Sequence, residues 1–154
     1  KTMIAYLSGA IENAPNDGKK WRLDMSNWLK NNLSHSSINP VAQTRELVKE
    51  YSAQEFRNWK KTNPYKFKNF VRLIIKQDLE FVINKSDYLI VMWDKSVLKG
   101  GGTHGEITMA YWFKKPIYVV NTLPIDDFSA WIYACSTNVY SSLDELKNDL
   151  LKIY

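Results

Sequence analysis

Two patterns of hydrophobic residues alternate along the chain. Short unbroken apolar runs are typical of strands buried on both faces, whereas apolar residues three or four positions apart are typical of helices with one covered face. The first pattern predicts strands at Met3–Ser8, Tyr88–Trp93 and Ile117–Val120, and two weaker ones at Ser36–Asn39 and Asn138–Tyr140. Strands separated by helices predict a parallel sheet with helices on both faces.

The second pattern predicts the helices between these strands. It is clearest from Phe67 to about Asn84, and further helices are predicted after residue 20, around 43–60, from Thr103 to before Pro116, at 127–135 and from Ser141 onward. No repeat or composition shift marks a domain boundary. We therefore expect a single domain over residues 1–154.

Polar residues follow the predicted strands at their C-terminal ends. Ser8 and Gly9 close the first strand, Asp94 follows the central one, and Asn39 and Asn121 follow two others. Ligands of open parallel sheets bind at this edge. We therefore expect the site there, with Ser8, Gly9 and Asp94 among the substrate-binding residues.

Composition excludes several classes of protein. Hydrophobic residues make up 45% and charged residues 24%, as in globular domains. The net charge of +5 suits an anionic ligand but falls short of a typical nucleic-acid-binding protein. No apolar run approaches the roughly 20 residues of a membrane span. One cysteine and two histidines disfavour a disulfide or a zinc site. We expect a soluble cytoplasmic protein without a metal or other cofactor.

Two carboxylates lie at positions that need an explanation, one on the apolar stripe of a helix and one near the start of another helix. Asp78 interrupts the apolar stripe of its helix, so it either caps a neighbouring loop or acts in the site, because a buried unpaired charge is costly. Glu106 completes Thr103-x-x-Glu106, which matches a capping box. Alternatively, Glu106 lies in the first helical turn as an ionised carboxylate that attacks a sugar carbon.

Two further segments have alternative interpretations. The run Gly100-Gly-Gly-Thr-His-Gly105 lacks the ending of a Walker motif, so we expect Gly100, Gly102 and Thr103 to let a ligand approach the backbone. We expect His104 to be a surface residue. Residues 45–76 carry nine Lys or Arg against three Glu, interleaved with aromatics. Either the cations bind phosphate and the aromatic rings stack on a base, or the segment forms a solvated face over packed aromatic rings.

Four motifs follow one another in the chain: Tyr6-Leu-Ser-Gly-Ala10; Gln77-Asp-Leu-Glu80 with Ser86-Asp87; Gly102-x-x-Gly-Glu106-x-x-x-Ala110 with Lys115-Pro116; and Ser129-Ala-Trp-Ile132. In order and approximate spacing they resemble the nucleoside 2-deoxyribosyltransferase-like family, which includes 2′-deoxynucleoside 5′-monophosphate N-glycosidases. The resemblance covers most of the chain and is poorest over residues 41–66. It implies a flavodoxin- or Rossmann-like three-layer α/β sandwich with a mostly parallel central sheet of about five strands.

The resemblance also implies an activity. This is cleavage of the N-glycosidic bond of a 2′-deoxynucleoside or its 5′-monophosphate through a covalent glutamyl-deoxyribosyl intermediate, which is passed to water or another base. Glu106 resembles the nucleophile, Tyr6 the tyrosine that orients it, and Asp78 the aspartate that assists the leaving group. A homodimer or higher homo-oligomer with shared active sites is implied as well, in which Ser129 and Trp131 complete a neighbour's pocket.

The two branches of the family differ in their substrate. Ser129 resembles the phosphate-binding serine of the monophosphate hydrolases, and the positive charge favours the same branch. Ala10 and Glu12 replace a serine and an arginine of that branch, and Gly100 matches neither branch. On balance we expect a 5′-phosphorylated substrate, which requires Glu12 to point outward.

Two other classes of function remain open. One is a non-catalytic nucleotide-binding module of the same fold, and the other is a nucleic-acid-binding protein that uses residues 45–76. The pair of carboxylates argues against both.

Overall fold

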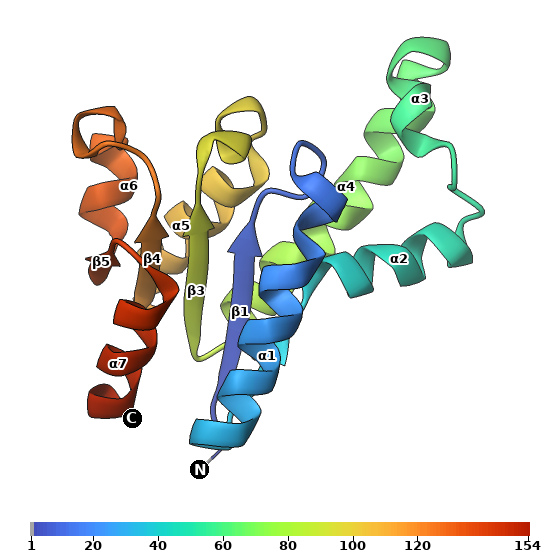
Figure 1. The fold of residues 1–154 in the computed structure, drawn as a ribbon. Helices are drawn as coiled ribbons and strands as arrows, with labels where there is room; N and C mark the ends of the chain where they lie inside the picture. Colours follow the sequence, from blue (N-terminus) through green and yellow to red (C-terminus); the bar gives the residue numbers. More distant parts are fainter. Residues whose placement is uncertain (1) are drawn as a thin grey trace.

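A five-stranded parallel sheet forms the centre of the molecule in the computed structural model, which describes residues 2–154 (Figure 1). Its strand order is β2-β1-β3-β4-β5, and all neighbouring strands pair in parallel. The strands are β1 (Ile4–Gly9), β2 (Ser36–Ile38), β3 (Tyr88–Trp93), β4 (Ile117–Asn121) and β5 (Asn138–Tyr140). The predicted α/β fold and all five predicted strands are confirmed.

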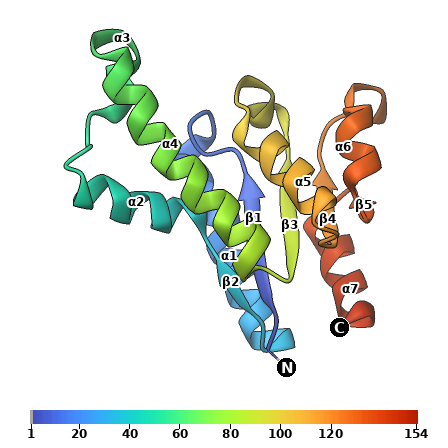
Figure 2. The ribbon, with the colours of Figure 1, turned by 180° about the vertical axis from the view of Figure 1, so that it is seen from behind.

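Helices cover both faces of the sheet, which gives three layers (Figures 1 and 2). They are α1 (Lys19–Leu33), α2 (Pro40–Glu50), α3 (Phe56–Thr62), α4 (Pro64–Glu80), α5 (Gly102–Trp112), α6 (Ala130–Cys135) and α7 (Leu143–Ile153). Helices α1 and α7 pack on one face, and α5 and α6 pack on the other together with Phe81–Lys85, the π-helical turn that continues α4. None of the helices described in residues 2–154 combines the length and apolarity that a membrane span needs.

The chain between β2 and β3 departs from the prediction of one helix around 43–60 and another from Phe67. It forms three helices instead, and two Asn-Pro pairs explain the boundaries. Asn39 and Asn63 cap α2 and α4 with their side-chain oxygens, and the proline that follows each asparagine occupies the first helical position. Ser52 then takes a φ of 49° just after α2, a conformation that a continuous helix excludes.

These three helices bury a small core of their own. Ala53, Phe56 and Phe70 form a cluster separate from the two that sandwich the sheet. We call residues 40–76 the arm. Figure 1 shows that the arm reaches past the C-terminal ends of the strands, with α3 farthest out. The arm therefore stands beside the edge at which parallel sheets bind ligands.

Candidate active site

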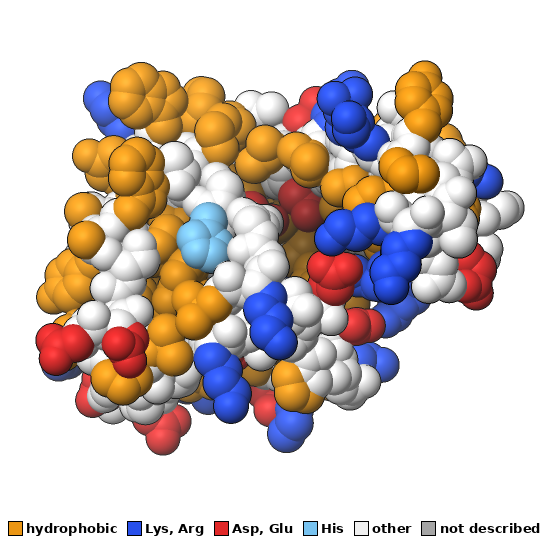
Figure 3. Space-filling view, turned by 90° about the horizontal axis from the view of Figure 1, so that it is seen from above, with side chains coloured by type: hydrophobic (Ala, Val, Ile, Leu, Met, Phe, Trp, Pro, Cys, Tyr) orange, Lys and Arg blue, Asp and Glu red, His pale blue; other side chains and the backbone are white. Residues whose placement is uncertain are grey.

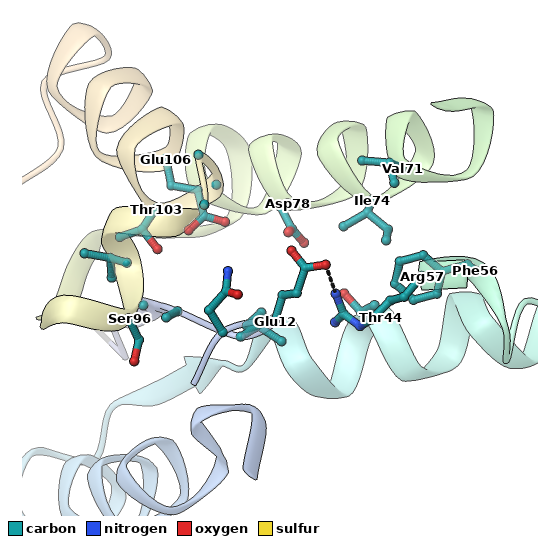
Figure 4. A pocket seen from close by; sticks show the side chains of 18 of the residues that line it. Glu12, Thr44, Phe56, Arg57, Val71, Ile74, Asp78, Ser96, Thr103 and Glu106 are labelled. Atoms are coloured by element: carbon teal, nitrogen blue, oxygen red, sulfur yellow. Dashed lines mark ion pairs between the residues drawn. The ribbon is translucent and has the colours of Figure 1, made fainter. Parts of the chain in front are cut away.

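A cavity of about 240 Å³ opens at the C-terminal ends of β1 and β3. These neighbouring strands mark the topological switch point of the sheet order. The loop after β1 and the glycine segment 100–103 form one side, and the arm forms the other (Figure 4). Figure 3 looks onto this end of the molecule and shows the hollow with acidic side chains inside it.

Glu106 lies at the floor of this cavity and is only 7% exposed. Its Oε2 accepts a hydrogen bond from the Tyr6 hydroxyl at 2.5 Å, and its Oε1 accepts one from Ser8 Oγ at 2.7 Å. Tyr6 and Ser8 are two positions apart on β1 and therefore point to the same face of the sheet. Both are fully buried behind Glu106, so they position the carboxylate rather than contact a ligand. This differs from the prediction that Ser8 binds substrate.

The capping-box interpretation of Glu106 is wrong. Helix α5 begins at Gly102 with Gly101 as its N-cap, and no side chain caps it. Glu106 therefore lies in the second turn rather than the first, beyond the backbone N–H groups that need a capping partner. Its two oxygens bind the hydroxyls of β1 instead. The carboxylate is held by tertiary contacts and not by its own helix.

Asp78 enters the same cavity from α4 (Figure 4). Its Oδ1 is buried and has no hydrogen-bond partner among the described residues. Burial and the nearby charge of Glu106 raise the pKa of Asp78 to about 8. Burial also raises the pKa of Glu106, but the hydrogen bonds from Tyr6 and Ser8 oppose that rise. Asp78 is therefore largely protonated at neutral pH, whereas Glu106 accepts two hydrogen bonds that favour its ionised form.

Arg22 was missed by the sequence analysis. It is fully buried on α1, and its Nε and Nη2 donate to the carbonyl oxygens of Leu7 and Gly9 at 3.1 and 2.8 Å. Gly18 has a φ of 66°, and a Cβ added there would lie 2.6 Å from Arg22 Nη1. The guanidinium thus holds the end of β1 and the loop after it. It lies three residues before the buried Met25, a spacing that places it on the apolar stripe of α1.

The predicted glycine-rich segment does line the cavity. Gly9, Gly100, Gly102 and Thr103 are all part of its wall. Gly100 and Gly101 have φ values of −117° and −112°, so backbone conformation does not require glycine there. A Cβ added at Gly101 or Gly102 would meet no atom within 4 Å. These glycines leave space that a larger residue would take from a ligand.

Besides Tyr6 and Ser8, three further predicted site residues lie outside the cavity of their own chain. Asp94 accepts a hydrogen bond from the Ser96 N–H and starts a short 3-10 turn. Ser129 caps α6 through its side chain, and Trp131 is 66% exposed with its Nε1 donating to Thr108 Oγ1. His104 is half-buried against the ring of Trp93 rather than freely exposed, and it is not among the residues that line the cavity.

The arm contributes one wall of the cavity, largely from residues 45–76, for which the sequence left ligand binding and a solvated face as alternatives. This wall consists of Thr44, Phe56, Arg57, Phe67, Val71 and Ile74. Half of these residues, Thr44, Phe56 and Arg57, come from the stretch in which the family resemblance is poorest. Arg57 forms an ion pair with Glu12 of the loop after β1, with 3.1 Å between Nη1 and Oε2 (Figure 4). Glu12 thus lines the cavity and does not point outward.

Comparison with known proteins adds no relative. A scan against models of protein families gives no match, and a search of curated proteins gives none either. The candidate site therefore rests on its own geometry. A buried, hydrogen-bonded carboxylate faces a protonated one across a small cavity, an arrangement suited to nucleophilic and acid–base chemistry. Within residues 2–154, no three His, Cys, Asp or Glu side chains converge as metal ligands.

Proposed function

We propose that this protein cleaves the N-glycosidic bond of a 2′-deoxynucleoside or its 5′-monophosphate, with Glu106 as the nucleophile and Asp78 as the acid. The observation that carries the proposal is the Glu106 carboxylate at the cavity floor, fixed by two hydroxyls and facing Asp78. A retaining glycosidase uses one carboxyl group as nucleophile and a second one, with a raised pKa, as acid, and the pKa of Asp78 is raised to about 8. The resemblance of the motifs around these residues points to the same reaction.

The reaction runs in two displacements. Glu106 forms a bond to the anomeric carbon as the bond to the base breaks, and the proton of Asp78 goes to the departing base. Asp78, now ionised, then takes a proton from water or from a second base, and that acceptor displaces Glu106 from the sugar. Tyr6 and Ser8 hold the attacking oxygens in place throughout. Every bond and proton is accounted for by side chains of the cavity and the substrate.

The proposal includes a homodimer in the cytoplasm. Trp112 and Trp131 are 76% and 66% exposed on the neighbouring helices α5 and α6. Monomeric proteins rarely expose large apolar side chains side by side, because their contact with water is unfavourable. Ser129 and Trp131 do not line the candidate active-site cavity of their own chain, which fits residues that complete the cavity of a neighbouring chain. Cys135 is a free thiol, as in most proteins of a reducing compartment.

Incubation with a panel of deoxynucleosides and their 5′-monophosphates tests the activity by release of free base. We expect the Glu106→Gln variant to fold normally and to lose at least a thousandfold in turnover, because an amide is a poor nucleophile. Glu50→Gln is the matched control, since Glu50 is exposed at the end of α2. A 2′-fluoro nucleoside, which slows the second displacement, should add one sugar to the mass of the wild-type protein. Near-normal turnover by Glu106→Gln would overturn the proposal.

A further inference from the structure

We infer that the cavity selects a substrate with an uncharged sugar end, a deoxynucleoside rather than its 5′-monophosphate, and that Glu12 and Arg57 make this selection. The inference rests on the proposed function and decides between its two substrate classes. It reverses the expectation of a phosphorylated substrate that Ser129 and the positive charge suggested. The reason lies in where the charges are placed.

The cavity itself is acidic. Its described lining residues include three carboxyl groups, those of Glu12, Asp78 and Glu106, and one cation, Arg57. Even without Asp78, the two carboxyl groups of Glu12 and Glu106 outnumber the one guanidinium group. A phosphate dianion would enter against this excess, and repulsion between close charges is strong where water is partly excluded. A neutral deoxynucleoside meets no such barrier.

The basic residues of the arm do not offset this charge. All nine are exposed, and Arg57 alone lines the cavity. Lys68, Arg72 and Lys76 are spaced four apart along α4, on a side of the helix different from that of Phe67, Val71 and Ile74, which line the cavity. Salt screens exposed charges beyond about 8 to 10 Å. The positive net charge of the chain therefore says little about the ligand of this cavity.

Arg57 already has an anionic partner within the cavity. Its guanidinium binds the Glu12 carboxylate and lies over the Phe56 ring at 4.9 Å from the centroid. The two charged side chains are 43% and 54% exposed, and such surface pairs contribute little to stability. A phosphate would have to displace a carboxylate that stays within the cavity. A hydroxyl suits the pair better, because it can donate to Glu12 and accept from Arg57 at once.

The test compares kcat/KM for the four common deoxynucleosides with kcat/KM for their 5′-monophosphates at low salt. We expect the wild type to prefer the nucleosides at least tenfold. Glu12→Gln keeps the shape of the side chain, removes its charge and releases Arg57, so the preference should shrink at least tenfold, mainly through faster use of the monophosphates. Glu50→Gln is the control: it changes the net charge by the same amount, but Glu50 lies on the arm and does not line the cavity. This variant should keep the preference within twofold of the wild type.

A wild-type preference for monophosphates would overturn the inference, and so would an unchanged preference in Glu12→Gln. Calorimetric binding of the same ligand pairs to the wild type separates this inference from the proposed reaction. If nothing is cleaved but nucleosides bind more tightly than monophosphates, the reaction fails and the selection stands. Tighter binding of the monophosphates, or no binding of either ligand, contradicts the selection.

Discussion

Asp78 and Glu106 differ in what surrounds each carboxyl group, and that difference supports the roles that we propose for them. Glu106 accepts two hydrogen bonds, each of which favours its ionised form. Asp78 keeps one oxygen buried without a partner and faces the charge of Glu106. The same two residue types in exchanged surroundings would exchange nucleophile and acid. The burial that raises the pKa of Asp78, on which its proposed role as the acid depends, also affects the stability of the fold.

The pKa of Asp78 is raised from 3.8 to about 8, so the folded protein binds this proton more tightly than the unfolded chain. The contribution of Asp78 to the free energy of unfolding is therefore fully present at low pH and is lost as the pH rises from about 4 to about 8. We expect Asp78→Asn, which stays uncharged, to be more stable than the wild type at pH 9 by roughly 2 to 4 kcal/mol, and to differ little at pH 4. Urea unfolding of both proteins across this range measures the effect.

Parallel stability profiles of the two proteins would contradict that expectation. Activity provides a second readout of the same proton. The wild type should lose kcat as the pH rises past about 8, because Asp78 can no longer protonate the leaving base. Asp78→Asn should show low activity without this pH dependence.

Some of these residues could be predicted from the sequence and others could not. Asp78 was found because a short acidic side chain interrupts an apolar stripe. Arg22 occupies a comparable position on α1 and was overlooked, because a long side chain with a charged end usually reaches solvent. Glu12 and Arg57 meet only through tertiary structure. No local pattern marks such a contact.

At the level of elements, the strands and α4 were predictable, whereas the division between α2 and α3 was not. Buried parallel strands are continuous apolar runs and stand out in the sequence, as does the apolar stripe of α4. The core of the arm takes only Phe56 from α3 and no fully buried residue from α2, so neither of these two helices shows a long stripe. The Asn-Pro pairs at 39–40 and 63–64 were the available signals, as they start α2 and α4.

Phe70 packs between the segments of the arm and thereby fixes the position of the cavity wall that the arm forms. It is 4% exposed and contacts the rings of Tyr51, Phe56 and Trp59. We expect Phe70→Ala to lower the free energy of unfolding by about 3 kcal/mol. It should also raise KM severalfold with a smaller change in kcat, because α3 carries Phe56 and Arg57 of the wall whereas Glu106 lies on α5. Steady-state kinetics and urea unfolding measure the two effects.

Tyr65→Ala provides the control on the same helix, since Tyr65 is 78% exposed and does not line the cavity. It should leave both stability and KM nearly unchanged. An unchanged KM in a destabilised Phe70→Ala protein would show that the position of the arm does not affect substrate binding.

At the scale of the whole molecule, the arm carries nine Lys and Arg residues and also exposes the rings of Tyr51 and Tyr65. A second group of exposed aromatic side chains lies on α5 and α6. It consists of Tyr111, Trp112, Trp131 and Tyr133. An exposed aromatic surface of this kind is typical of a protein–protein interface. The proposed dimer would cover this surface and bring Ser129 of one chain toward the site of the other.

We expect sedimentation equilibrium at micromolar concentration to give twice the mass of the chain. Trp112→Glu should yield a folded monomer, because a charge on a covered apolar surface opposes association. If sites are shared, that monomer should lose at least tenfold in kcat/KM although Trp112 does not line its own cavity.

Mixing two inactive variants provides a sharper test of shared sites. Glu106→Gln and a Ser129→Ala/Trp131→Ala double variant should each be impaired alone. A mixed dimer of the two contains one site in which every side chain is intact, so it should regain activity. A fully active monomer, or no recovery on mixing when mixed dimers form, would contradict shared sites.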